Sequence, residues 1–376
     1  MMYESIIITL LAVYALRMLY FAVGARKENS KMLNEIAAGS EPMVTIVVPA
    51  RNEEARIEDC IRSIARNQYP REKFEIIAVN DRSEDETGQL LESLKREIPN
   101  LSVIHNDKSK AIKNLQGKPG ALQLAINSCR GTIILMTDAD CTVSETWIRS
   151  HAATFQNSNL GITAAYTNII GSNPFSRIQA VEWLYLHTMA IGGMGHGQPL
   201  SCYGNNISLH KEKFDTIGGY SALKFSITED LAMLQAMHKH GYDTRHLSDE
   251  ASMINTYANK TLREYLNQHH RWIVGAADLK WKAAYFVLST LAIWSALVIS
   301  IANQDYLMAG IATLTRILCD LSLILPAMYR LKRGELAKWL LPAIIFMMVI
   351  ELIAPVFLLK RDVRWKGQVF TDEEAN

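Results

Sequence analysis

The feature that most constrains this chain is the run Ala283–Ala302, in which none of the 20 residues is charged. A helix of that length crosses the ~30 Å hydrocarbon layer of a membrane. Ile6–Val23 is a second apolar run, broken only by Arg17, and two further runs with few charges are Tyr306–Tyr329 and Trp339–Leu359. The chain therefore folds partly in lipid, which excludes a simple soluble single-domain protein.

Basic residues beside these runs predict their orientation, because Lys and Arg gather on the cytoplasmic side of membrane segments. Arg26-Lys27 follow the first run, whereas a signal peptide carries its charge before the apolar core. We therefore expect an uncleaved N-terminal membrane anchor over residues 1–25, with its N-terminus outside. Lys280 and Lys282 place the start of the second run in the cytoplasm.

The last apolar run presents a conflict. Arg330, Lys332 and Arg333 place its start inside, yet basic residues from Lys360 onward also follow its end. Either the charge rule fails there or the segment does not fully cross, and we favour a re-entrant or interfacial segment. We thus expect membrane helices within residues 283–359 and a cytoplasmic tail over 360–376.

Arg316 and Asp320 interrupt the third apolar run. They lie four residues apart and share one helix face, so they can neutralise each other. We expect a self-paired polar patch inside the helix cluster; the alternative is a functional site, since charges within a membrane often have a function.

Residues 42–272 have the mixed composition of a soluble α/β domain. From Met43 onward, short β runs alternate with amphipathic helices, which predicts a mostly parallel, Rossmann-like mixed sheet. Thr132–Met136 is continuously apolar, as a strand covered on both faces requires. Ligands of such sheets bind at the carboxyl ends of the strands. No GxGxxG follows a strand and no GxxxxGK[ST] occurs, which disfavours dinucleotide and P-loop sites.

The overall composition excludes two further classes. The formal net charge is +1, so no bulk electrostatic attraction to nucleic acid is expected. The five cysteines are scattered without a CxxC pair. This argues against a disulfide framework or a structural zinc site and fits a reducing compartment.

Acidic residues follow several predicted strands. Glu53 follows the first strand, Asp81 follows the second, and Asp138-Ala139-Asp140 follow the fourth. Acidic residues also end strands and cap helices, so a single one carries little weight. Two carboxylates two residues apart, however, can reach one hard divalent cation. Such a cation holds a diphosphate and stabilises it as a leaving group.

The order of the motifs resembles that of the family 2 glycosyltransferases, which are inverting enzymes of the GT-A fold. The likeness covers residues 42–272, and its parts occur in the family's order. These parts are Pro49-Ala50-Arg51-Asn52-Glu53, Asp81, Gly117-Lys118, Asp138-Ala139-Asp140, Gly204-Asn205, Thr228-Glu229-Asp230 and Gln268-His269-His270-Arg271-Trp272. His269 departs from the family, which often has Gln or Arg at that place.

The resemblance implies the GT-A nucleotide-diphospho-sugar transferase fold with flanking transmembrane helices, and a role for each motif residue. Glu53, Asp81 and Lys118 would contact the nucleotide. Asp138 would contact the nucleotide or the metal, and Asp140 would ligate Mn²⁺ or Mg²⁺. Asp230 would be the general base, and Glu229, Gln268, Arg271 and Trp272 would border the acceptor and the diphosphate. Two alternatives stay open: a helix cap for Asp230 and an interface anchor for Trp272.

We therefore expect an integral protein of the bacterial cytoplasmic membrane whose catalytic domain faces the cytoplasm. It would transfer a sugar from a nucleotide sugar, with a UDP-sugar as the expected donor, to a lipid or lipid-linked hydroxyl. The alternative within the family is a processive polysaccharide synthase, although three or four membrane segments make a poor channel for a polymer. A non-catalytic membrane partner is a third interpretation, which the presence of Asp140 and Asp230 disfavours.

Overall fold

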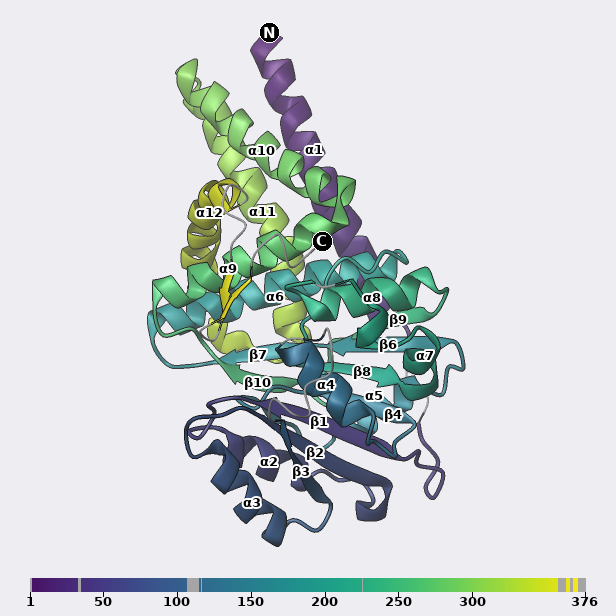
Figure 1. Ribbon diagram of the computed structural model, residues 1–376. Coiled ribbons are helices and arrows are strands. Elements are labelled where there is room, and N and C mark those ends of the chain that lie inside the picture. Colours follow the sequence, from purple (N-terminus) through teal and green to yellow (C-terminus); the bar gives the residue numbers. More distant parts are fainter. Residues whose placement is uncertain are drawn as a thin grey trace.

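The computed structural model describes residues 2–32, 35–106, 115, 117–224, 226–357, 363–365 and 368–370. An α/β domain forms one part, and long helices rise from it as the second part (Figure 1). The chain enters through the first long helix, builds the α/β domain, and returns to the helical part at the end.

A seven-stranded sheet forms the centre of the α/β domain, in the order β3-β2-β1-β4-β8-β6-β9. Its strands are β1 (Val44–Ala50), β2 (Phe74–Asp81), β3 (Leu101–Asn106), β4 (Ile133–Met136), β6 (Leu160–Ala165), β8 (Ile207–His210) and β9 (Asp243–Leu247). Strand β8 runs antiparallel to β4 and β6, and the other neighbouring strands are parallel. The predicted mostly parallel, mixed sheet is confirmed.

Helices cover both faces of this sheet. Successive strand residues point to opposite sides, and here both sets of side chains are apolar and buried. Ile46 and Val48 pack in one core, whereas Val47 between them packs in another. The first core is shared with α2 (Ile57–Ala65), α3 (Thr87–Glu97) and α5 (Trp147–Thr154). The second is shared with α4 (Lys118–Ile126), α7 (Lys211–Thr216) and α8 (Glu229–Lys239).

A second, three-stranded sheet has the order β5-β10-β7, with strands β5 (Thr142–Val143), β7 (Thr167–Ile170) and β10 (Ile254–Tyr257). Strands β7 and β10 are parallel neighbours, and Ile170 lies opposite Tyr257. Helix α6 (Pro174–Gly195) follows β7, and α9 (Leu262–Ala276) follows β10. These two helices therefore start from the same end of one sheet and run between it and the long helices (Figure 1).

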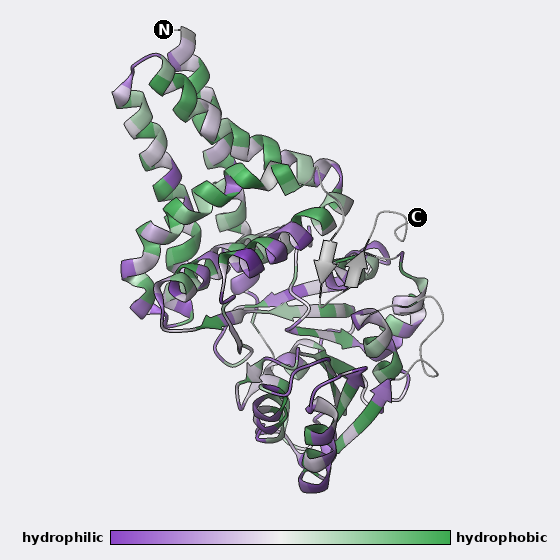
Figure 2. Cartoon of the chain, turned by 60° about the vertical axis from the view of Figure 1, so that its left-hand side comes forward, coloured by the Kyte–Doolittle hydropathy of each residue, from purple (hydrophilic) through white to green (hydrophobic). Residues whose placement is uncertain are grey.

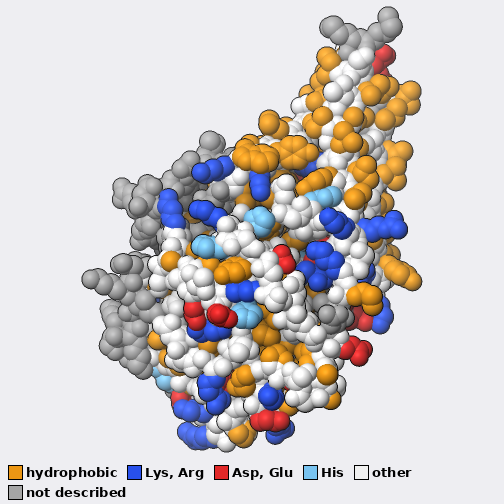
Figure 3. Space-filling model, turned by 90° about the vertical axis from the view of Figure 1, so that its right-hand side faces the viewer, with side chains coloured by type: hydrophobic (Ala, Val, Ile, Leu, Met, Phe, Trp, Pro, Cys, Tyr) orange, Lys and Arg blue, Asp and Glu red, His pale blue; other side chains and the backbone are white. Residues whose placement is uncertain are grey.

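Within the described residues, four helices are long and apolar enough to cross a membrane. They are α1 (Met2–Asn29), α10 (Trp281–Ala302), α11 (Tyr306–Arg330), and the segment Gly334–Ile353 that contains most of α12 (Leu340–Phe357). Figure 2 shows their largely apolar composition, and Figure 3 shows Lys and Arg side chains gathered below them. The predicted tail lies largely outside the described residues; of it, β11 (Val363–Trp365) and β12 (Gln368–Phe370) pair antiparallel.

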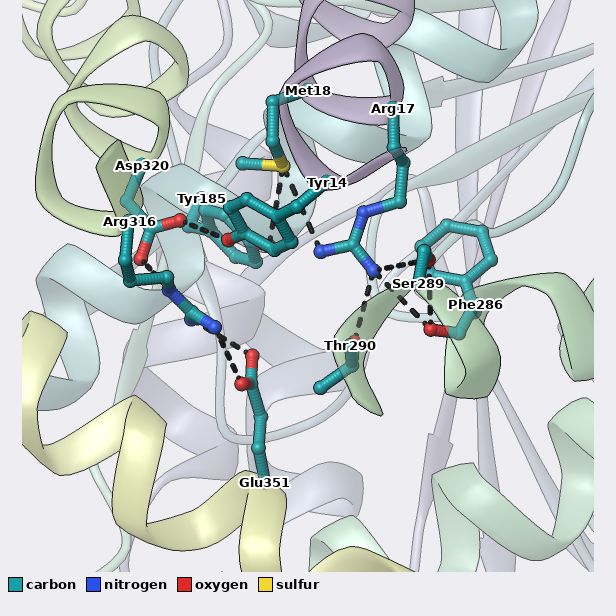
Figure 4. A network of polar contacts seen from close by, with 10 residues as sticks. All are labelled: Tyr14, Arg17, Met18, Tyr185, Phe286, Ser289, Thr290, Arg316, Asp320 and Glu351. Carbon is teal, nitrogen blue, oxygen red and sulfur yellow. Dashed lines mark hydrogen bonds and ion pairs between the residues drawn. The ribbon is translucent and has the colours of Figure 1, made fainter. Parts of the chain in front are cut away.

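The predicted Arg316–Asp320 pair forms, but it belongs to a larger network (Figure 4). Arg316 Nε lies 2.7 Å from Asp320 Oδ2, and the other guanidinium nitrogens bind both oxygens of Glu351 on α12 at 2.6 and 2.9 Å. Tyr14 on α1 donates to Asp320 at 2.7 Å. Arg17 donates to hydroxyl groups of α10 instead. The network thus joins α1, α11 and α12, which the expectation of a self-paired patch did not include.

Candidate active site

A cleft of about 220 Å³ opens where β1, β2 and β4 end, on the side toward α6 and α9. Every site residue predicted from the sequence lines it: Glu53, Asp81, Lys118, Asp138, Asp140, Glu229, Asp230, Gln268, Arg271 and Trp272. The parallel register explains four of these positions, Glu53, Asp81, Asp138 and Asp140, because Ala50 lies opposite Asn80 and Val47 lies opposite Met136. Residues that follow these strands therefore meet at one edge.

Asp81 lies at the end of β2 and is buried. The guanidinium of Arg82 binds both of its oxygens, at 2.8 and 3.0 Å, and Asn106 donates to Oδ1 at 2.7 Å. The carboxylate is thereby held in a fixed orientation at the floor of the cleft. Sequence reasoning identified Asp81 but not the two residues that orient it.

Lys118 is the first residue of α4 and the central cation of the cleft. Its ammonium lies 2.7 Å from Asp138 Oδ1 and 3.4 Å from Glu229 Oε1. Burial alone would lower its pKa, but the nearby charges of Asp138 and Glu229 raise the pKa above its usual value. Lys118 therefore stays charged and holds the strand β4 end against the start of α8.

Asp138 and Asp140 fit a divalent cation that a diphosphate helps to hold. Among the described residues, no group of three or more His, Cys, Asp or Glu side chains is placed to hold a metal ion alone. Mg²⁺ sites that bind substrate phosphates commonly use only one or two carboxylates, the remaining ligands being phosphate and water oxygens. Asp138 and Asp140 both line the cleft, supply hard oxygen donors, and come from one strand end.

Asp230 lies in the first turn of α8, directly beside Glu229. Its Oδ2 accepts a hydrogen bond from the Gly204 amide at 2.7 Å, and Oδ1 accepts one from the Leu231 amide at 2.8 Å. Burial and the charge of Glu229 raise the pKa of Asp230 to about 6, against the opposing charges of Lys118 and Arg271. Thr228 occupies the N-cap position without a capping hydrogen bond from its side chain, and Asp230 lies two residues further along in the first turn.

Two glycines allow the cleft to be packed this closely. A Cβ on Gly204 would lie 3.2 Å from Asp230 Oδ2 and 3.3 Å from Lys118 Nζ. A Cβ on Gly275 would lie 2.4 Å from Thr228 Oγ1, so α9 packs tightly against the residue before Glu229 and Asp230. Larger residues at these positions would push the proposed base out of place.

Helix α9 brings the last motif to the other wall of the cleft. Gln268, Arg271 and Trp272 line it, and the ring of Trp272 lies edge-on to Trp183 and Tyr203, with centroids 5.8 and 5.5 Å apart. Trp272 thus faces the cleft, which disfavours the pure interface-anchor alternative. Trp183 and Tyr203 also line the cleft and were missed from the sequence, although Tyr203 directly precedes the Gly204-Asn205 motif.

The sequence model described as "Glycosyl transferase family 2" matches residues 45–232 of the 376-residue chain, half of its length. The chain therefore belongs to glycosyl transferase family 2, and the predicted family is confirmed. In the solved structure of the mannosyltransferase PcManGT from Pyrobaculum calidifontis, in complex with GDP-Man and Mn²⁺, 98% of that chain aligns with 96% of this one. The TM-score is 0.60 at 18% sequence identity, which confirms the GT-A fold.

Two named relatives correspond to the two activities that were expected from the sequence. The chain is 27% identical over 244 residues to beta-monoglucosyldiacylglycerol synthase of Trichormus variabilis, a match of 63% of this chain and 49% of that protein. It is 26% identical over 253 residues to poly-beta-1,6-N-acetyl-D-glucosamine synthase of Staphylococcus aureus, a match of 66% of this chain and 58% of that protein. The matched region thus spans about half the length of these relatives.

Proposed function

We propose that this protein is a membrane-bound inverting glycosyltransferase. It moves a sugar from a nucleotide-diphosphate sugar to a hydroxyl group of a lipid or lipid-linked acceptor. The observation that carries this proposal is the meeting, in one cleft, of the carboxylate Asp230 with Lys118 and the Asp138/Asp140 pair. Asp230 is suited to take a proton, and Lys118 and the Asp138/Asp140 pair are suited to bind a diphosphate and its cation.

The raised pKa of Asp230, about 6, suits a general base. At neutral pH the carboxylate is ionised, yet it accepts a proton more readily than an ordinary aspartate does. Asp230 would take the proton of the acceptor hydroxyl while that oxygen attacks the anomeric carbon, opposite the leaving diphosphate. Attack on that face inverts the anomeric configuration.

The diphosphate gains negative charge as the sugar leaves. Lys118 and Arg271 line the cleft as fixed positive charges and would stabilise it. A divalent cation bound by Asp138 and Asp140 would supply further electrophilic stabilisation. The GDP-Man and Mn²⁺ of the structural neighbour support a nucleotide-sugar donor and a divalent cofactor.

The place of the cleft beside the membrane helices supports a lipid acceptor. Helix α9, which carries Gln268, Arg271 and Trp272, ends only a few residues before α10. A lipid acceptor can therefore reach Asp230 without leaving the bilayer surface. We place the catalytic domain, residues 42–272, on the cytoplasmic side of a bacterial cytoplasmic membrane, with the anchor at 1–25 and the membrane helices at 283–359.

The test is a transfer assay with the purified protein in detergent. Radiolabelled UDP-, GDP- and dTDP-sugars are each incubated with total bacterial membrane lipid and Mn²⁺, and products are separated on a lipid gel. We expect one labelled lipid that disappears when Asp230 is replaced by Asn. Equal labelling by wild type and Asp230→Asn would contradict the role of this residue.

The polysaccharide synthase among the relatives keeps a second candidate open, a processive synthase. The same gel distinguishes the two functions. A single discrete glycolipid supports one transfer per acceptor, whereas a ladder or an immobile polymer supports processive synthesis.

A further inference from the structure

Helix α6 packs against the membrane helices on one face and contacts α9 with another. Ala180, Val181 and Leu184 pack in the apolar core that α6 shares with the membrane helices. Gln179 and Glu182, three residues apart on the helix, bind groups on and just before α9. Helix α6 thus connects the membrane part of the molecule to the helix that carries the last motif (Figure 1).

Glu182 is a buried carboxylate, only 4% exposed, and it does not line the cleft. Its Oε1 accepts hydrogen bonds from the Tyr265 hydroxyl at 2.5 Å and from His269 Nε2 at 3.0 Å. Its Oε2 has no hydrogen-bond partner among the described residues. A buried charge of this kind is costly unless it is paired. Its position against α9 therefore calls for an explanation.

The hydrogen bonds around His269 show that Glu182 faces a positive charge. Both ring nitrogens of His269 face acceptors: Nδ1 lies 3.0 Å from the Tyr265 carbonyl oxygen, and Nε2 faces Glu182. With Glu182 ionised, both partners are acceptors, and a histidine that donates to two acceptors is the charged imidazolium. Burial opposes that charge, but Glu182 raises the pKa of His269. Glu182 and His269 therefore form a buried ion pair between α6 and α9.

Neighbouring contacts extend this pairing to the rest of the motif. The Asn259 amide N–H donates to Gln179 on α6 at 2.9 Å, and Asn259 Nδ2 donates to Gln268 at 2.9 Å. The ring of Trp183 on α6 lies edge-on to Trp272. Three residues of the motif are thus located by α6, and the charged link is the one to His269.

We propose that Glu182 is a positioning residue for sugar transfer. Through His269 it sets the rotation of α9 about its own axis, and that rotation directs Arg271 and Trp272 into the cleft. This inference rests on the proposed transferase activity, and it also gives a reason for the histidine where the family often has Gln or Arg.

The test compares Glu182→Ala with wild type in the lipid transfer assay, at saturating donor and acceptor. We expect kcat to fall about 10- to 100-fold, as for other losses of a group that orients an active-site residue. The donor KM should change less than kcat, because Arg271 acts chiefly on the negative charge that the diphosphate gains as the sugar leaves. The control is Glu75→Ala, which also removes a buried, ion-paired carboxylate, bound to Thr45 and Arg130 away from the cleft. It should lower the melting temperature but leave kcat unchanged.

Two further variants make the result decisive. Glu182→Gln keeps an oxygen and the side-chain shape, so it should fold and lose less kcat than Glu182→Ala. Glu182→Ala combined with His269→Ala should be no slower than the slower single variant, because both act through one contact. Wild-type kcat in folded Glu182→Gln and Glu182→Ala, or fully additive losses in the double variant, would overturn the positioning role. Transfer by the wild-type protein itself is the separate test of the proposed function.

Discussion

The raised pKa of Asp230 predicts how far the transfer rate falls at low pH. If this carboxylate must be ionised to take the acceptor proton, activity is present above its pKa and is lost as the pH falls through about 6. With that pKa, about 97% of the group is ionised at pH 7.5 and about 9% at pH 5. The transfer rate at pH 5 should thus be roughly one tenth of the rate at pH 7.5.

The appropriate measurement is kcat/KM for the donor between pH 4.5 and 8.5 at constant ionic strength and saturating Mn²⁺. This ratio reports ionisations of the protein before the donor binds. An aspartate with the ordinary pKa of 3.8 would still be almost fully ionised at pH 5, so its rate would be nearly flat over this range. At pH 5, the rates expected for the two pKa values therefore differ about tenfold.

A neighbouring substitution tests the physical cause of the shift. Because the charge of Glu229 raises the pKa of Asp230, Glu229→Gln should move the acid limb of the profile to lower pH, whatever it does to the maximal rate. Asp230→Asn should lose about 10²-fold or more and should leave a residual rate without this acid limb. A wild-type rate that is unchanged at pH 5, or an unmoved limb in Glu229→Gln, would refute the reasoning.

Three further predictions concern the metal, the membrane helices and the packing of α9. Removal of divalent cations with EDTA should abolish transfer, and Mn²⁺ or Mg²⁺ should restore it. Asp140→Asn should stay folded, as measured by circular dichroism, but should be inactive. Full activity of this variant in EDTA would contradict the metal role. Arg316→Met should lower the free energy of unfolding in detergent by about 3–5 kcal/mol, because two carboxylates lose their buried partner. Adding Asp320→Asn and Glu351→Gln to Arg316→Met should recover most of the lost free energy of unfolding. An unchanged unfolding midpoint in Arg316→Met alone would count against the network. Gly275→Ala should reduce kcat, because its Cβ would lie 2.4 Å from the Thr228 side chain. Thr228→Ala in the same protein should restore part of the rate. Equal rates in Gly275→Ala and wild type would show that this packing of α9 does not affect transfer.

The interfacial interpretation of the last apolar segment remains a prediction. Residues 334–353 form a helical segment that is long and apolar enough to cross, which is compatible with either topology. A cysteine introduced at Gly367, which lies outside the described residues, distinguishes them: an impermeant reagent applied to intact cells should not label it. Labelling from outside would establish a full crossing and place the tail away from the catalytic domain.

Much of this protein was determined by local sequence patterns. Long, largely apolar runs predicted the membrane helices, because a segment in lipid must satisfy its backbone polar groups internally and expose mostly apolar side chains. Continuous apolar strands predicted a sheet covered on both faces. Motif order then predicted the cleft residues, since parallel strands end at one edge and whatever follows them is brought together.

The tertiary structure alone decided which polar groups meet. Glu182 reaches His269 across 87 positions, Asn106 orients Asp81, and Glu351 completes the pairing of Arg316. Periodicity shows which face of a helix is apolar, but not which element it meets or which charge lies opposite. The direction and spacing of α6 and α9 depend on the parallel pairing of β7 with β10, strands that are far apart in the chain. Long-range pairing of this kind leaves no local pattern, so the residues that position the site emerge only from the folded chain.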